Sequence, residues 1–277
     1  MAFWSDITQS ILQRYPALTY PLYRRFWFAS AASVGAWQIS ALAMGWLVFD
    51  LSGSTLDLGI LGAATAIPAI VLTLVGGVIA DRFDKRLVLL VTTAINCSLL
   101  LLLTALAFSG VISVWQIWAI AAGVSFVSGI DWPTRQSFFP HLIEREGLLS
   151  AVALNSVLWQ ATRMVLPAFG GVLIAWFDVS LTFLLAAIGY LVMWVVLWRM
   201  PLKLPGTKGE SPLKQTLQGL RYISGHSFFR DLIILSYATM LFLSAYMQVM
   251  PPVADINTPK PAGPAPKRSA NAGITCI

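Results

Sequence analysis

Charged side chains inside long apolar segments are the residues of this sequence best placed to do chemistry. Arg163 lies near the middle of the apolar segment 150–177, which is the depth of the bilayer centre if that segment crosses a membrane. A charge at that depth is costly unless it faces a cavity or a partner, so such residues often mark substrate or ion pathways. We therefore predict that Arg163 contacts a substrate or a coupling ion. The alternative is an arginine that only holds helix ends or backbone carbonyls together.

A second polar group stands at the end of the fourth apolar segment, where Asp131, Pro133, Arg135 and Gln136 occur within one short stretch. Proline lacks the N–H that continues a helix, so Pro133 predicts the end of regular helix. If the helix continues that far, Asp131 and Arg135 lie one turn apart. We predict that these residues form the cytoplasmic end of the fourth helix.

Uncharged polar side chains supply further candidates. Gln38 lies among apolar neighbours in the first segment, Asn96 in the third and Asn155 near the start of the fifth. In a helix bundle such side chains line a substrate path or join helices through hydrogen bonds. We place Gln38 ahead of Asn96, and add Asn155, as candidates for contact with a substrate or coupling ion.

Several classes of chemistry have no support in the sequence. We find no paired carboxylates near histidines, no nucleophile arrangement and no phosphate-binding loop, so we predict that the protein is not an enzyme. The two cysteines and two histidines lie far apart, which predicts no metal site and no cofactor. The net charge of +6 comes from bases between apolar segments and not from a stripe with aromatic partners, so nucleic acid is not an expected partner.

The elements that position these residues are membrane helices. Hydrophobic residues make up 57% of the chain and charged residues 11%, whereas soluble domains have about 25% charged residues. A membrane-crossing helix needs about 20 apolar residues. Seven segments qualify or nearly qualify: 26–49, 58–80, 88–108, 114–129, 150–177, 181–198 and 232–250. The lipid bilayer is therefore an expected partner.

The basic residues between these segments predict the orientation. We number the connections by the apolar segment that precedes each of them. The first, third and fifth connections contain no Lys or Arg, whereas the N-terminal segment and the even-numbered connections do. Because basic loops stay in the cytoplasm, this alternation predicts a cytoplasmic N-terminus.

The connection between the second and third segments carries a dense charged motif. Gly77 stands near the end of an apolar run, Asp81 and Arg82 end that run, and Lys85 and Arg86 follow within a few residues. We interpret this stretch as a helix that enters a short cytoplasmic turn held by its bases. The alternative is an ordinary charged inner loop.

This motif resembles the signature between the second and third helices of the major facilitator superfamily, although Asp84 stands where the family usually has a second glycine. Pro167, Gly170 and Gly171 resemble the family's helix-bend motif in helix five, with Leu166 in place of its first glycine. The stretch holding Pro133, Arg135, Gln136, Pro140, Leu154 and Asn155 is similar to the enterobactin-exporter-like branch of the superfamily.

The resemblance implies an all-α integral membrane protein with the six-helix N-terminal bundle of a major facilitator transporter, a seventh helix and a disordered tail. The expected parts are a cytoplasmic segment 1–25, the bundle 26–198, a cytoplasmic linker 199–230, the seventh helix 231–250 and the tail 251–277. The tail is rich in Pro and Ala, and its bases break the charge rule. We expect a chain truncated or frame-shifted near the end of helix seven; the alternative is a genuine short form.

The implied function is secondary active transport in a bacterial inner membrane. The expected activity is export of siderophore-like or other amphipathic small molecules by alternating access. The charged motif at Asp81 would latch the cytoplasmic side. Proton coupling is open, because the mid-helix-four arginine of many drug–proton antiporters is missing. The alternative function is an inactive truncated half-carrier or membrane scaffold fragment, and a homodimer is the way such a chain would regain two bundles.

Overall fold

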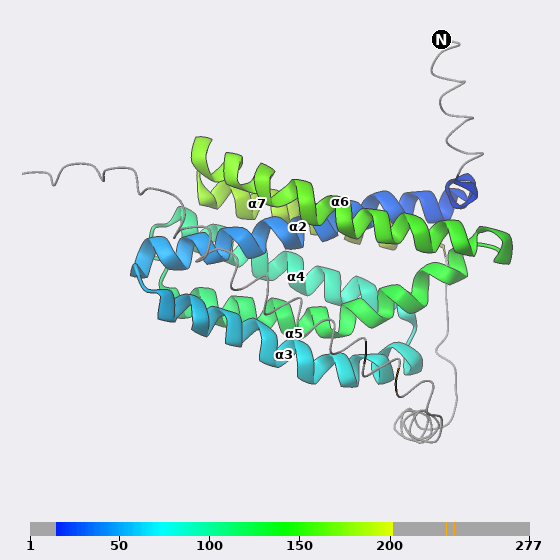
Figure 1. The fold of residues 1–277 in the computed structure, drawn as a ribbon, viewed down its shortest axis with the longest axis horizontal. Coiled ribbons are helices and arrows are strands. Elements are labelled where there is room, and N and C mark those ends of the chain that lie inside the picture. Colours follow the sequence, from blue (N-terminus) through cyan, green and yellow to red (C-terminus); the bar gives the residue numbers. More distant parts are fainter. Residues whose placement is uncertain (1–14, 202–230, 232–234, 236–277) are drawn as a thin grey trace, which may run out of the picture. The chain divides into compact units, whose positions relative to one another are not determined.

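The computed structural model describes residues 15–201 together with Asp231 and Leu235 (Figure 1). That part of the chain contains helices and no strand. Six long helices follow one another: α2 (Pro21–Ser52), α3 (Thr55–Arg82), α4 (Lys85–Phe108), α5 (Val114–Phe138), α6 (Leu148–Trp176) and α7 (Val179–Arg199). Short 3-10 turns stand at η1 (Pro16–Thr19), η2 (Phe139–Leu142) and η3 (Arg145–Gly147).

All six helices are long and apolar enough to cross a membrane. The predicted all-α membrane fold class is therefore confirmed. The predicted linker 199–230, the seventh helix 231–250 and the tail 251–277 lie, apart from a few residues, outside the described part of the chain, so these divisions stay predictions.

The fourth helix corrects one prediction. Pro133 does not stop it, because α5 continues through this proline to Phe138. Proline in a helix leaves the carbonyl four residues earlier without its donor, here that of Gly129. This carbonyl lies against Gly76 of α3, so closely that a Cβ atom on Gly76 would overlap the Gly129 oxygen. Helix α3 therefore packs closely against α5 at the carbonyl that the proline leaves without its donor.

The turn between α3 and α4 is shorter than the charged motif suggested. Only Phe83 and Asp84 are non-helical, and Lys85 and Arg86 already belong to α4. The reason is Asp84, whose carboxylate accepts hydrogen bonds from the backbone N–H groups of Arg86 at 2.9 Å and Leu87 at 3.4 Å. A side chain that caps a helix in this way fixes its first residue. The residue in place of the family's second glycine is therefore a helix cap.

Helix packing sets the rotation of each element. In Figure 1, α3 lies along α5, and α2 lies between the α6 and α4 layers. The described contacts pair α3 with α5, α2 with α7 and α6, and α4 with α7 and α5. Two buried clusters result: one centres on Leu100, Ile117 and Phe183, and the other on Tyr23, Phe138 and Met193.

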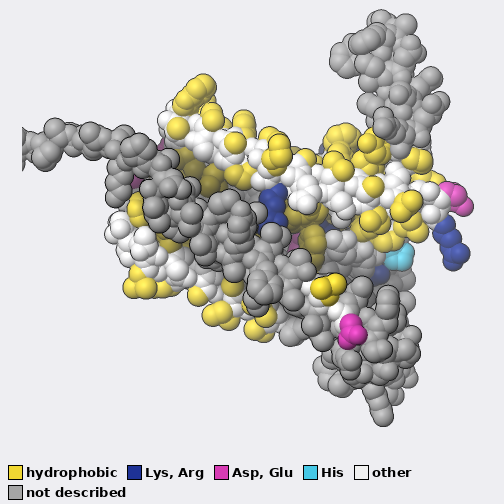
Figure 2. Space-filling view, in the orientation of Figure 1, with side chains coloured by type: hydrophobic (Ala, Val, Ile, Leu, Met, Phe, Trp, Pro, Cys, Tyr) yellow, Lys and Arg dark blue, Asp and Glu magenta, His cyan; other side chains and the backbone are white. Residues whose placement is uncertain are grey.

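The outer surface of these helices is apolar. Figure 2 shows hydrophobic side chains spread along the described helices, while charged side chains gather largely at the end where α2 begins. On α6, Leu149, Met164 and Trp176 are 84%, 82% and 80% exposed. Side chains of this kind are stable in contact with lipid or with further apolar helices and not with water.

Candidate functional site

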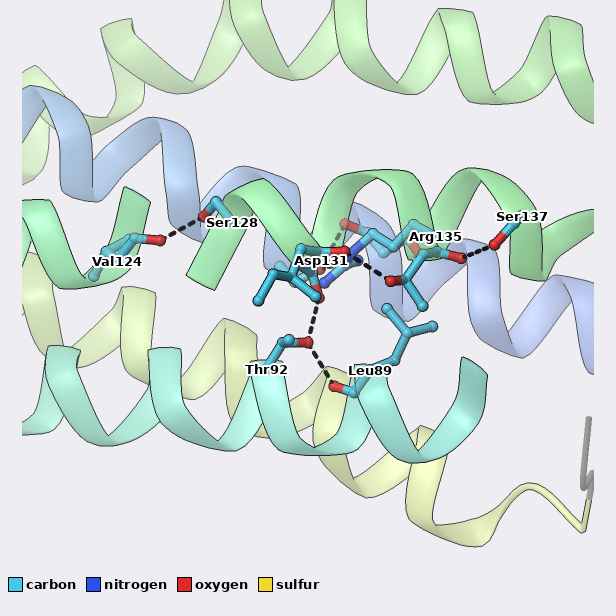
Figure 3. A network of polar contacts seen from close by, with 11 residues as sticks. Leu89, Thr92, Val124, Ser128, Asp131, Arg135 and Ser137 are labelled. Carbon is cyan, nitrogen blue, oxygen red and sulfur yellow. Dashed lines mark hydrogen bonds and ion pairs between the residues drawn. The ribbon is translucent and has the colours of Figure 1, made fainter. Parts of the chain in front are cut away.

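A buried ion pair on α5 forms the centre of the candidate site (Figure 3). Arg135 Nε donates to Asp131 Oδ2. Thr92 Oγ1 on α4 donates to Asp131 Oδ1 at 2.7 Å, and Arg135 Nη1 donates to Ser33 Oγ on α2 at 2.9 Å. The network therefore joins α2, α4 and α5.

The local fold explains why this pair forms. Asp131 and Arg135 are four residues apart, so the continuous helix through Pro133 places them on one face. Asp131 is 8% exposed and Arg135 is 9% exposed. Among the acidic and basic side chains that the structure describes, they are the two buried ones. Each charge is compensated by the other, because an unpaired charge at this depth would be strongly unfavourable.

Beside the pair lies a cavity of about 350 Å³, here called the paired-charge cavity. Its lining residues come from α2, α3, α5, α6 and α7: Ser33, Val34, Trp37, Ala69, Ser128, Gly129, Asp131, Trp132, Arg135, Trp159 and Tyr190. Pockets of this size are suitable for small organic ligands or parts of larger ones.

Three tryptophans form the aromatic wall of the paired-charge cavity. The Trp159 ring of α6 lies edge-on to Trp132 of α5, with centroids 4.5 Å apart. The Trp37 ring of α2 lies 6.2 Å from Trp159. The cavity is therefore amphipathic, with indole rings on one side and a hydrogen-bonded ion pair on the other.

Two predicted polar residues lie close to this site. Asn155 and Gln136 line a small adjoining space of about 20 Å³, together with Arg135, Trp132 and Trp159. The predicted group at the end of helix four is thus brought together with Asn155. Whether these residues bind a substrate stays a prediction.

The other predicted candidates lie elsewhere. Arg163 is on the exposed surface of α6, and it lines neither the paired-charge cavity nor the small space beside it. Gln38 is half-buried and likewise lines neither of them. Asn96 is buried, and neither its amide nitrogen nor its oxygen has a hydrogen-bond partner within the described part.

The predicted helix-bend motif lies inside an uninterrupted helix. Pro167 stands within α6, which continues from Leu148 to Trp176. A Cβ atom on Gly170 would lie 3.1 Å from Leu42 Cδ2 of α2, so this glycine permits close helix packing, whereas the same position on Gly171 has open space around it.

The bases of the charged motif bind the ends of neighbouring helices. Arg86 Nε and Nη2 donate to the carbonyl oxygens of Leu197 and Trp198 at 2.9 and 2.8 Å, which satisfies the C-terminal end of α7. Lys85 Nζ lies 3.5 Å from the carbonyl oxygen of Ser137 and 3.2 Å from Nε2 of His141, beyond the end of α5. Arg82 is exposed, and the side chains of Gly77 and Asp81 lie outside what the structure describes.

Sequence reasoning missed the aromatic wall and the partners of the ion pair. Trp37, Trp132 and Trp159 were not among the predicted site residues. Thr92 and Ser33 carry no signal of their own, because Ser and Thr are common in membrane helices. The available signal was two tryptophans inside the apolar segments 26–49 and 150–177, and a third, Trp132, next to Asp131 just after the segment 114–129.

The described part of the chain is thus a bundle of helices able to cross a membrane, with a buried ion pair beside a cavity. The family described as transmembrane secretion effector matches residues 13–262, so the chain belongs to this family of major facilitator transporters and is similar to its enterobactin exporters. The family and the relatives are transporters and not enzymes.

The relatives agree on this class. The staphyloferrin A transporter of Staphylococcus aureus is 29% identical over 82% of this chain and 58% of its own length. The uncharacterized MFS-type transporter YfiS of Bacillus subtilis is 26% identical over 74% and 48%. The enterobactin exporter EntS of Citrobacter koseri is 25% identical over 86% and 57%. The chain thus spans about half the length of the curated relatives it matches. No solved structure matches it significantly.

Proposed function

We propose that this chain forms the substrate-binding bundle of a secondary active exporter for siderophore-like or other amphipathic small molecules. The observation that carries the proposal is the paired-charge cavity, in which Asp131 and Arg135 face three indole rings. An amphipathic molecule can place a ring against the indoles and an oxygen toward the guanidinium. The relatives named for staphyloferrin A and enterobactin support this substrate class.

The ion pair in the cavity indicates whether a charged or an uncharged ligand group would bind there. Asp131 and Arg135 compensate each other, so the cavity has no net charge to attract a free anion. Arg135 uses the N–H of Nε and one N–H of Nη1 in the described hydrogen bonds, so the second N–H of Nη1 and both of Nη2 are left for a ligand. We propose that the cavity binds an uncharged ring with hydroxyl or carbonyl oxygens.

We further propose alternating access with Asp81 and its loop as the cytoplasmic latch, a cytoplasmic N-terminus and residence in a bacterial inner membrane. For proton coupling, Asp131 is the leading candidate, because it is the buried carboxylate among those described. Arg163, Gln38 and Asn155 stay candidates for other contacts with a substrate or coupling ion.

The test is an export assay in a bacterial host that makes enterobactin or staphyloferrin A and lacks its own exporter. Trp159→Ala removes one indole from the cavity, and Trp176→Ala is the matched control on the same helix, 80% exposed. We expect Trp159→Ala to reduce export at least about tenfold, the effect of losing roughly 1.4 kcal/mol of binding, and Trp176→Ala to leave it unchanged. Equal export by both variants at equal membrane abundance would contradict the proposal.

A second candidate function is a half-carrier that needs another bundle, because the chain spans about half the length of its relatives. A homodimer would supply that bundle in its simplest form. The size of the crosslinked protein in detergent and the substrate flux in vesicles distinguish an active homodimer from an inactive half-carrier. Flux by a crosslinked dimer supports the homodimer, whereas a monomer without flux supports the inactive half-carrier.

A further inference from the structure

A second cavity of about 260 Å³ lies between α2, α3 and α5. We call it the apolar cavity. Its lining residues are Trp37, Ser40, Ala41, Met44, Leu58, Leu61, Gly62, Thr65, Ala121, Val124 and Ser125. No charged side chain is among them, in contrast to the paired-charge cavity, which Asp131 and Arg135 line.

Two of the three hydroxyl groups that line the apolar cavity, those of Ser40 and Thr65, are turned to their own helices. Ser40 Oγ donates to the carbonyl oxygen of Trp37 at 3.0 Å. Thr65 Oγ1 lies 2.9 Å from the carbonyl oxygen of Gly62 and 3.1 Å from that of Leu61. Because a hydroxyl has one hydrogen to donate, these two donors are already used, whereas the Ser125 hydroxyl has no hydrogen-bond partner among the described residues. The cavity wall is therefore uncharged and mostly hydrocarbon, with the Ser125 hydroxyl as a polar group that a ligand can contact.

The two cavities are neighbours along the same helices. Trp37 lines both of them. On α2 the paired-charge cavity uses residues up to Trp37 and the apolar cavity uses residues from Trp37 onward. On α5 the order is matched, because Val124 and Ser125 line the apolar cavity and Ser128 lines the paired-charge cavity one turn later. One molecule that passes the Trp37 indole can contact both.

We infer that the apolar cavity is a second subsite, which binds the uncharged hydrocarbon part of the substrate whose polar ring occupies the paired-charge cavity. Trp37 separates the two subsites and contacts both parts of the ligand. The inference rests on the proposed function and adds the chemical class of the second group. It also gives a physical reason for selecting amphipathic molecules, since a ring without a tail fills one subsite only.

Two glycines of α3 provide a matched pair of variants. Gly62 lines the apolar cavity and Gly59 lines neither cavity. Both are exposed, and a Cβ atom at either would have open space around it. Gly62→Leu therefore fills the apolar cavity without a backbone clash, and Gly59→Leu adds the same side chain to the same helix outside it.

The experiment measures equilibrium binding of resorcinol and of 4-hexylresorcinol to the full chain in lipid nanodiscs. Empty nanodiscs correct for partition into lipid. Each buried methylene strengthens binding about fourfold, so we expect 4-hexylresorcinol to bind the parent chain far more tightly than resorcinol. Gly62→Leu should weaken binding of 4-hexylresorcinol at least about tenfold, the loss expected when two methylenes are displaced, and leave resorcinol binding unchanged. Gly59→Leu should change neither.

The outcomes separate the two proposals. If resorcinol binds and Gly62→Leu binds 4-hexylresorcinol as tightly as Gly59→Leu, the second subsite is refuted while the proposed substrate cavity stands. If the parent chain binds neither probe, the paired-charge cavity is not a site for an uncharged hydroxylated ring, and the second subsite fails with it.

Discussion

Removing one charge of the buried pair should destabilise the bundle more than removing an exposed charge. Arg135→Met leaves the Asp131 carboxylate buried with Thr92 as its remaining described hydrogen-bond donor. Asp131→Asn leaves the guanidinium buried with Ser33 as its remaining partner. Breaking a buried pair by removing one member typically costs about 3–5 kcal/mol, because the other charge stays buried and uncompensated.

The double variant Asp131→Asn with Arg135→Met removes both charges and should lose less than the sum of the single variants. For residues in one network the expected coupling free energy is about 0.5–3 kcal/mol, and the burial of this pair places it at the upper end of that range. Arg163→Met is the matched control: its guanidinium is exposed on α6, so the expected change is within about 0.5 kcal/mol.

The assay is reversible unfolding of the full chain in mixed micelles, followed by helical circular dichroism as the denaturing detergent increases. Free energies of unfolding are compared for the parent, the two single variants, the double variant and Arg163→Met. Single-variant losses below about 1 kcal/mol, or a double variant equal to the sum of the two, would refute the view that the pair compensates two buried charges.

Three further predictions use the same unfolding measurement. Gly76→Ala should cost about 1–3 kcal/mol, because its Cβ would overlap the backbone of α5, while Gly59→Ala should be tolerated; equal effects would contradict the close approach. Asp84→Ala should cost about 1 kcal/mol through loss of the α4 cap, and no loss would remove that role. Arg86→Met should cost about 1.5–3 kcal/mol, because it leaves two carbonyl oxygens at the end of α7 without donors, whereas Arg82→Met should be nearly neutral.

The helices were predictable because an apolar segment long enough to cross a membrane has few alternatives to helix. Their ends were less predictable, since the apolar run does not show where a cap stands. Asp84 starts α4 at Lys85, earlier than the predicted residue 88. The first helix starts at Pro21 and not at residue 26, because proline is favoured in the first turn of a helix.

The sequence could predict which site residues lie close together only when they belong to one helix, where their spacing gives their relative positions. The spacing of Asp131 and Arg135 placed them one turn apart if the helix continued through Pro133, and in the structure the helix continues and the two side chains form an ion pair. Thr92 and Ser33 belong to other helices, and their approach depends on how each helix is rotated in the bundle. The position of Arg163 was not predictable for the same reason. Its depth in the membrane follows from the sequence, but α6 is apolar around most of its circumference, so the sequence does not indicate which face of α6 packs against the other helices.

The contacts of Lys85 and Arg86 change what a latch experiment can show. Both bases already bind carbonyl oxygens within this bundle, at the ends of α5 and α7. Loss of export in an Arg86 variant would therefore follow from a disturbed helix end as readily as from a lost latch. Arg82 is exposed, so it is the base of this motif whose substitution isolates the latch. Reduced export by Arg82→Met at unchanged stability would favour the latch, and normal export would leave the bases of this motif with the structural role of binding helix ends.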